Sequence, residues 1–481
     1  MSCNRRFTLN TVSLACLVCC MASCAVGPDY HKPEVAIPAN WRRDMQSAPN
    51  FQQAQPSDEK RKGNWWEMFD DDQLNQLEVQ ALDHNQNLVV AVAALNRARQ
   101  LVNVNSAAQL PSVDLQTGDQ RFKTSADRPL AAYGIPNQSI VQNILQVGLA
   151  VNYEADLFGR VRRGVEGAKA AAEQADADFE NTRLILMSDL ATSYFNLREL
   201  DQEIEIVQKG VALQKKALDF IQNRYQLDFA TGLDLAQQQS LVESSQTQLA
   251  LLQNQRAALQ NAIATLTGTP APEFKLAAVA SLATVPTMPA ALPSEVLQRR
   301  PDVAAAERAM AVANANIGVA KAAYYPSIML QASGGYQSNQ WANLLSAPSI
   351  LWSLGVAASE HLFDNGKTTA TVNIAEASYS AAVASYRQSV LVAMQEVQTG
   401  IDSMTLLTIA ANRAAASATS SEKAYDIANA RYTGGVDIYL NVITAQQTLL
   451  TNQRQAVQIQ GQQLVNAVYL VKAMGGGWQG T

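Results

Sequence analysis

Residues 145–154 read Leu145-Gln146-Val147-Gly148-Leu149-Ala150-Val151-Asn152-Tyr153-Glu154. Every second side chain is apolar and the others are polar or small, which is the period of a β-strand with two different faces. The same alternation predicts three more strands, so we expect strands at about 112–123, 145–156, 327–337 and 349–361. About ten residues per strand suits a transmembrane strand. A soluble sheet with one wet face has the same pattern, so alternation alone leaves both open.

The strands belong to a unit that occurs twice in the chain. Leu110-Pro111-Ser112-Val113-Asp114-Leu115-Gln116 recurs as Tyr325-Pro326-Ser327-Ile328-Met329-Leu330-Gln331. Arg224-Tyr225 and Gly268 recur, at one constant spacing, as Arg431-Tyr432 and Gly475. We therefore expect a first repeat at 72–268 and a second repeat at 301–475.

Proline placement indicates where long helices can form, because proline breaks helix interiors. Proline is absent from 137 to 269 and from 349 to 481, and it clusters in an inter-repeat linker and equatorial region at 269–300. At 1.5 Å per residue, a helix over 160–228 would be roughly 100 Å long. The predicted helices are 72–108, 160–228 and 233–267 in the first repeat, and 301–324, 366–433 and 440–474 in the second.

Apolar residues in the first long helix follow a 3,4 spacing, which indicates a coiled-coil seam rather than a globular stripe. The seam comprises Leu197, Leu200, Ile204, Val207, Val211, Leu218, Ile221 and Tyr225, with Gln214 as its one polar member. An isolated two-stranded coiled coil would show the same spacing, but it would not need the four amphipathic strands.

The first residues have the features of a bacterial secretion signal. Arg5 and Arg6 precede an apolar stretch too short to span a bilayer, and Met21-Ala22-Ser23 precede Cys24. We predict a signal peptide at 1–23, acylation of Cys24, an extended lipidated segment at 24–71 and a C-terminal tail at 476–481. An ordinary signal peptide with an incidental cysteine is the alternative. No cysteine follows Cys24, so disulfides play no part in the body of the protein.

Four strands are too few to close a membrane barrel, for which about eight are the minimum. Lipid does not tolerate open sheet edges. If the strands span a membrane, several chains must share one barrel, and three chains would supply twelve strands.

Composition argues against other classes of protein. The net charge of −6 does not favour nucleic acid as a partner. The chain has three histidines, His31, His84 and His361, and none has metal-ligand spacing. No Gly-x-Ser-x-Gly elbow, phosphate-binding loop or cysteine nucleophile occurs. We therefore expect no enzyme activity, no metal and no cofactor.

Several motifs resemble the TolC-type outer-membrane factors, and most closely the lipoprotein branch of the drug-efflux duct proteins. They are Trp65-Trp66, Asp156-Leu157-Phe158-Gly159-Arg160, Leu297-Gln298-Arg299-Arg300-Pro301-Asp302-Val303, Tyr325-Pro326-Ser327 and Gly475-Gly476-Gly477-Trp478. The resemblance covers essentially the whole mature chain. It implies a homotrimer with a twelve-stranded outer-membrane barrel, continued by a long periplasmic helical barrel.

The resemblance also implies a function. It predicts the lipid-anchored exit duct of a tripartite efflux pump, which passes small molecules such as drugs from an inner-membrane pump and a periplasmic adaptor to the exterior. The exit duct of a type I protein secretion system has the same architecture and is the alternative. The sequence does not identify the cargo, the pump or the adaptor.

The resemblance places the functional residues at the turns between paired helices. Adaptor contacts are expected at Phe229, Ala230, Thr231, Gly232 and Leu233, and at Gly434, Gly435, Val436 and Asp437. A periplasmic gate is expected at Asp234, Tyr432, Leu440, Asn441 and Thr444, with a Tyr–Asp pair joining neighbouring coils and Leu440 narrowing the tunnel. The acidic rings of some relatives correspond to the neutral Asn441 and Thr444, which leaves cation block open.

Overall fold

The computed structural model describes residues 25–42, 51–53, 63–127, 138–279, 281–290 and 293–476. The chain forms two compact units, each assembled from several parts of the sequence. The first unit contains the described residues among Met1–Pro33, Leu95–Ala175 and Ala306–Ser385. The second contains those among Glu34–Ala94, Asp176–Ala305 and Tyr386–Thr481.

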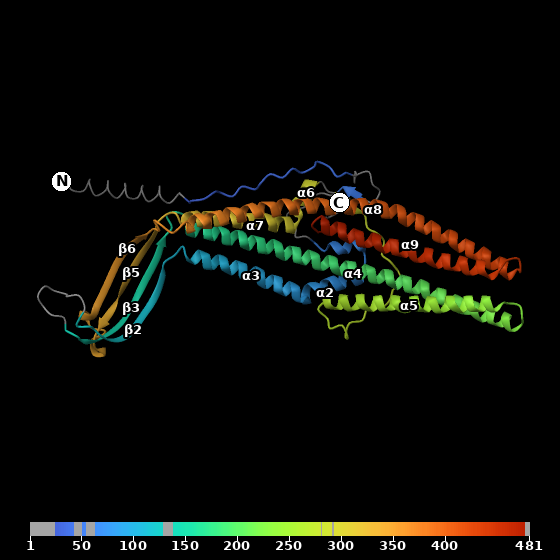
Figure 1. The fold of residues 1–481 in the computed structure, drawn as a ribbon, viewed down its shortest axis with the longest axis horizontal. Coiled ribbons are helices and arrows are strands. Elements are labelled where there is room, and N and C mark those ends of the chain that lie inside the picture. Colours follow the sequence, from blue (N-terminus) through green and yellow to red (C-terminus); the bar gives the residue numbers. More distant parts are fainter. Residues whose placement is uncertain are drawn as a thin grey trace. The chain divides into compact units, whose positions relative to one another are not determined.

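Helices of the two repeats correspond in order and in length (Figure 1). Pairs of 22, 35 and 67 residues are formed by α3 (Gln86–Ala107) and α7 (Pro301–Ala322), α5 (Gly232–Leu266) and α9 (Tyr439–Ala473), and α4 (Arg160–Gln226) and α8 (Lys367–Thr433). The predicted mainly helical fold, with two repeats and four main strands, is confirmed. Both 67-residue helices lie in the proline-free parts of the chain.

The predicted single helix over 72–108 is wrong, because the helix is interrupted at Asn85. Helix α2 (Asp72–His84) ends there, and Asn85 has an extended backbone with φ −68 and ψ 123. Its side-chain oxygen accepts hydrogen bonds from the backbone N–H groups of Asn87 and Leu88, at 2.9 and 3.3 Å, so Asn85 caps the start of α3. Its amide donates to the Leu266 carbonyl at 2.8 Å. The capping bonds and this contact stabilise the break.

The predicted extended segment 24–71 contains ordered structure. Strand β1 (Phe51–Gln53) pairs in parallel with β4 (Met288–Ala290). A 3-10 helix, η1 (Trp65–Phe69), buries Trp65, Trp66 and Phe69. The Phe69 ring packs on Phe195 of α4, with 4.7 Å between the centroids. The Trp65-Trp66 motif is therefore part of the main core of the second unit.

The buried Arg300 organises the end of the linker between the repeats. Helix α6 (Pro293–Arg299) leads into Arg300, whose guanidinium contacts both carboxylate oxygens of Asp302 at 2.7 and 3.0 Å. Arg300 also donates to the Ala473 carbonyl at 2.8 Å and pairs with Glu396 at 2.6 Å. The Arg-Arg-Pro-Asp motif thus joins the start of α7 to α8 and to the end of α9.

Four of the described strands form an antiparallel sheet in the order β2-β3-β5-β6. The strands are β2 (Ser112–Lys123), β3 (Val141–Ala155), β5 (Ser327–Ser338) and β6 (Ile350–Ser359). Two 3-10 helices, η2 (Trp341–Asn343) and η3 (Ala347–Ser349), connect β5 to β6. Strand β3 begins at Val141, before the predicted position 145, because it continues to pair with β2 as far as Lys123.

Among the described residues, no helix combines the length and the apolar character needed to cross a membrane.

Candidate functional sites on the sheet and at the helix turns

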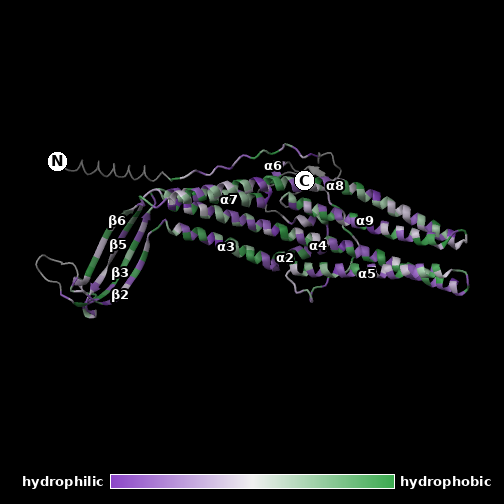
Figure 2. Ribbon diagram, in the orientation of Figure 1, coloured by the Kyte–Doolittle hydropathy of each residue, from purple (hydrophilic) through white to green (hydrophobic). Residues whose placement is uncertain are grey.

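Cross-strand pairing sorts the side chains of the sheet into an apolar face and a polar face. One row joins Val113, Val151, Ala332 and Leu354; the next joins Leu115, Leu149, Gly334 and Trp352; the third joins Thr117, Val147, Tyr336 and Ile350. Intervening residues such as Gln116, Gly148 and Ser353 lie on the other face, which is mostly polar or small. Figure 2 shows the resulting alternation of hydrophobic and hydrophilic segments along the strands.

Most of the apolar face lacks a covering layer within the described chain, although Leu145, just beyond the three rows, is buried. Trp352, Leu354 and Val356 of β6 are 74%, 77% and 72% exposed. From Ile328 to Tyr336 the face covers nine residues of β5, roughly 27 Å along the strand at about 3.4 Å per residue and about 20 Å of height for a strand tilted by about 40°. An outward apolar band about 25 Å tall is typical of outer-membrane barrels. The dimensions and exposure of this face therefore suit contact with lipid.

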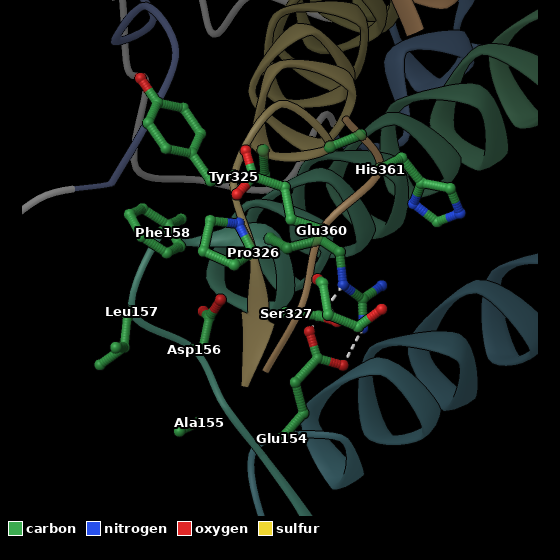
Figure 3. A pocket seen from close by; sticks show the side chains of 14 residues that line it. Glu154, Ala155, Asp156, Leu157, Phe158, Tyr325, Pro326, Ser327, Glu360 and His361 are labelled. Carbon is green, nitrogen blue, oxygen red and sulfur yellow. Dashed lines mark hydrogen bonds and ion pairs between the residues drawn. The ribbon is translucent and has the colours of Figure 1, made fainter. Parts of the chain in front are cut away.

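The ends of β3, β5 and β6 meet helix α4 around a cavity of ≈ 200 Å³ (Figure 3). Glu154 binds the Arg160 guanidinium at 2.8 Å, and Asp156 accepts from the backbone N–H groups of Val161 and Arg162. The Phe158 and Tyr325 rings stack with centroids 4.7 Å apart. Two of the motifs that indicated the family meet here through this ring stack, while the polar groups of Glu154 and Asp156 bind the start of α4. The cavity is accordingly a structural joint.

The segment Ala25–Pro33 is bound to helices α4 and α7. Arg163, 5% exposed, donates to the Val26 and Gly27 carbonyls and to Asp29, the last at 2.8 Å. Gly27 has a φ of +105 and lies so close to Gly318 that a Cβ on Gly27 would overlap the Gly318 backbone, while a Cβ on Gly318 would overlap the Arg163 side chain. No local sequence pattern indicates this contact. Cys24, the predicted acylation site, lies outside the described residues.

The first turn, Leu227–Thr231, connects α4 to α5 and is stabilised by a capping box. The Asp234 amide donates to Thr231 Oγ1 at 3.1 Å, and the Asp234 carboxylate accepts from the Thr231 amide at 3.0 Å. Asp228 has the left-handed backbone, with a φ of 60. Gly232 was expected to form part of the turn, but it is the first residue of α5.

The second turn, Gly434–Ile438, connects α8 to α9 by different chemistry. Gly435 has a φ of +77. Arg431 pairs with Asp437 at 3.0 Å, and Asp437 also accepts from the Ile438 amide and the Asn441 side chain, at 2.9 and 2.7 Å. Arg431 and these hydrogen bonds hold the pKa of Asp437 below its usual range.

Apolar side chains are exposed in and beside both turns. Phe229, Leu233, Val436 and Ile438 are between 62% and 70% exposed. Among the other predicted contact residues, Ala230 and Thr231 belong to the first turn, and Gly434, Gly435 and Asp437 to the second. Exposed apolar groups beside polar turns are typical of interaction surfaces.

The predicted gate residues lie near the turns, but Asp234 and Tyr432 are not hydrogen-bonded to each other within the described chain. Asp234 is engaged with Thr231 of its own turn. The Tyr432 ring packs on Tyr439, 4.9 Å between centroids, and the Arg224 guanidinium lies 5.4 Å from its centre. Leu440, Asn441 and Thr444 follow in the first turns of α9, with Leu440 47% exposed.

A buried hydrogen bond that the sequence did not reveal joins the two helical hairpins, α4–α5 and α8–α9. Tyr439 donates to the side-chain oxygen of Gln238 at 2.7 Å, and the Gln238 amide donates to the Gln214 carbonyl at 2.7 Å. Gln214 and Gln238 are fully buried, and the Gln214 side chain has no hydrogen-bond partner among the described residues. A polar residue in a coiled-coil seam, noted at Gln214, was the available signal; its distant partners were not predictable from spacing.

Known proteins match this chain along almost its whole length. The model of the outer membrane efflux protein family matches residues 77–269 and 292–476. The solvent efflux pump outer membrane protein SrpC of Pseudomonas putida is 30% identical over 459 residues, which cover 95% of this chain and 96% of that protein. The pyoverdine export outer membrane protein OpmQ of Pseudomonas aeruginosa is 29% identical over 467 residues, covering 97% and 96%.

Solved structures have the same fold. The outer-membrane channel OprN superimposes with a TM-score of 0.86 at 28% identity, covering 95% of this chain and 100% of that one. The outer membrane protein VceC of Vibrio cholerae gives a TM-score of 0.80 at 27% identity, covering 86% and 99%. The arrangement of helices and strands is thus that of channel proteins.

Proposed function

Because the chain belongs to the outer membrane efflux protein family, we propose that it is the trimeric exit duct of a tripartite efflux pump. Family membership makes it an outer-membrane efflux channel and not an enzyme. The finer elements of the proposal are its assembly, its partners, its cargo, its gate and its lipid anchor.

The observation that carries the proposal is the sheet with one exposed apolar face and two unpaired edges. Strands β2 and β6 are the edges of the described four-stranded sheet. In lipid, each unpaired backbone group costs several kcal/mol, so spanning strands must form a closed barrel. Three chains would pair β2 of one with β6 of the next, giving twelve strands with the apolar faces outward and the polar faces lining a water-filled lumen.

The two turns support a partner-binding role. We infer that a periplasmic adaptor binds Phe229–Leu233 and Gly434–Asp437, where exposed apolar groups lie beside polar side chains. Asp234, Tyr432, Leu440, Asn441 and Thr444 would form the gate between neighbouring chains. The relatives named for solvent and pyoverdine export favour small molecules as cargo, delivered by an inner-membrane pump.

We also propose that Cys24 is acylated, as expected for the lipoprotein branch of these duct proteins. The small residues before Cys24 support acylation, and the bound segment Ala25–Pro33 would place the anchor close to the joint between strands and helices. Mass spectrometry of the mature N terminus tests this point: a free thiol on Cys24 would exclude it, while the barrel could still insert.

Planar bilayer recording tests the channel itself. Purified protein should migrate as a trimer, and it should conduct ions without an energy source. Its gene should restore drug resistance to a strain that lacks its own duct but retains the matching pump and adaptor. A stable monomer with native strand content and no conductance would contradict the shared barrel.

A further inference from the structure

Two cationic side chains, Arg121 and Lys123, lie on the same face of β2 as the apolar rows and beyond the last of them. Arg121 and Lys123 lie on the same face as Val113 and Leu115, because alternate residues of a strand share a face. Both cations are exposed. Arg121 lies two rows beyond Thr117, the last uncharged member of that face of β2, at the end of the strand away from α3.

Neighbouring strands within the chain do not neutralise these cations. The cross-strand partners of Arg121 and Lys123 are Asn143 and Val141, which are uncharged. Among the described residues, neither cation forms an ion pair. Asp119 is the one acidic residue on this face of β2, so two positive charges lie beside one negative charge.

A neighbouring chain in the proposed trimer would not neutralise them either. Strand β2 is an edge strand, and its partner across the interface would be β6 of the next chain. No charged residue occurs from Ser327 to Ser359, which includes β5, β6 and their connection. Whatever the register of the new pair, that hairpin offers no carboxylate to Arg121 or Lys123.

We propose that Arg121 and Lys123 bind the phosphate groups of anionic lipids in the leaflet that surrounds the hairpin end of the sheet. The site rests on the proposed barrel, with its hairpins toward the exterior. Guanidinium groups bind phosphate through paired hydrogen bonds. Two rows of a tilted strand correspond to roughly 10 Å of height. That height moves the charges out of the hydrocarbon layer and toward the headgroups, while the acyl chains contact the apolar rows. A trimer would carry three such sites.

Lipid retention measured by native mass spectrometry tests the site. Detergent-purified trimers would be mixed with phosphatidylglycerol or with zwitterionic phosphatidylcholine. Wild-type protein should retain phosphatidylglycerol preferentially. R121Q/K123Q should bind it about 30-fold more weakly, equivalent to about 2 kcal/mol for two basic residues near an anionic surface. D119N should bind it more tightly, because it removes the nearby negative charge.

A matched control is K215Q/K216Q, which removes two exposed lysines from α4 and should leave lipid retention unchanged. Equal retention by wild type and R121Q/K123Q, or equal retention of both lipids by wild type, would overturn the proposal. Displacement of the lipid by millimolar inorganic phosphate would show a site for free phosphate instead. R121Q/K123Q should still conduct in neutral bilayers, so loss of the site is distinguishable from failure of the channel assignment.

Discussion

Each of the two helix turns connects a 67-residue helix to a 35-residue helix, but the two turns are stabilised differently. In the first turn, Thr231 and Asp234 form a reciprocal capping box and Asp228 supplies the left-handed residue. In the second, Gly435 supplies that residue, no side chain caps Ile438, and an ion pair joins Arg431 to Asp437. Equal backbone architecture therefore does not require equal chemistry, and the turns should respond differently to mutation, salt and pH.

The largest effect is expected from loss of the buried hydrogen bond that joins the two helical hairpins. Tyr439→Phe would leave the buried side-chain oxygen of Gln238 without its donor, at a cost of about 1–3 kcal/mol. Hydrogen exchange should accelerate at the adjoining ends of both hairpins, and single-channel conductance should rise. Restriction of the change to α9 would contradict coupling between the hairpins. The double variant Q238L/Y439F should recover only part of the loss, because it removes both partners of this bond but also removes the Gln238 amide that donates to the Gln214 carbonyl.

Valine scanning of the glycines should separate the turns next. Gly435→Val forces a β-branched residue to a φ of +77 and should cost at least about 1–2 kcal/mol. Gly232→Val should be nearly neutral, because Gly232 begins a helix and the nearest atom to an added Cβ is 3.8 Å away, in Tyr225. Adaptor-dependent drug resistance and thermal unfolding of the trimer measure both variants. Equal losses would show that Gly232 has a role beyond its backbone conformation.

Removal of the cap should have a smaller effect, limited to the first turn. Thr231→Ala should destabilise the start of α5 by about 1 kcal/mol, a usual cost for losing an N-cap side chain. Ile438→Ala is the matched control, since Ile438 occupies the N-cap position of α9 without a side-chain bond. Amide exchange in the first turn of each helix provides the measurement. Similar acceleration in both variants would argue against the capping box as the cause.

The smallest effect concerns pH at the second turn. Because the pKa of Asp437 is lowered in the folded protein, its stabilising contribution is complete above the pKa of the unfolded chain, about 3.9, and disappears as pH falls through the folded value. Amides near Ile438 should therefore exchange relatively faster under acid conditions, after correction for intrinsic exchange. Asp437→Asn should remove this pH dependence without altering the first turn. Persistence of the dependence in that variant would assign it to another group.

Local features of the sequence predicted most of the fold. The absence of proline and the alternation around Leu149 indicated the long helices and the strands, because these signals arise from the backbone itself. The interruption of the helix at Asn85 was not predicted, because the surrounding residues favour a helix. The capping bonds of Asn85 replace the backbone hydrogen bonds that a continuous helix would have formed there. At the candidate sites, the turns were located by resemblance. The Tyr439–Gln238 bond and the contact of Gly27 with Gly318 join residues far apart in sequence, so no local pattern identifies them.

Equal lengths of the paired helices have a consequence for stoichiometry. A symmetric trimer would present six hairpin turns of similar shape but only three of each chemical kind. A partner that recognised the backbone outline alone could bind in six copies, whereas one that required the Asp437 carboxylate would bind in three. The number of adaptor molecules per duct would then report whether shape or side-chain chemistry determines recognition.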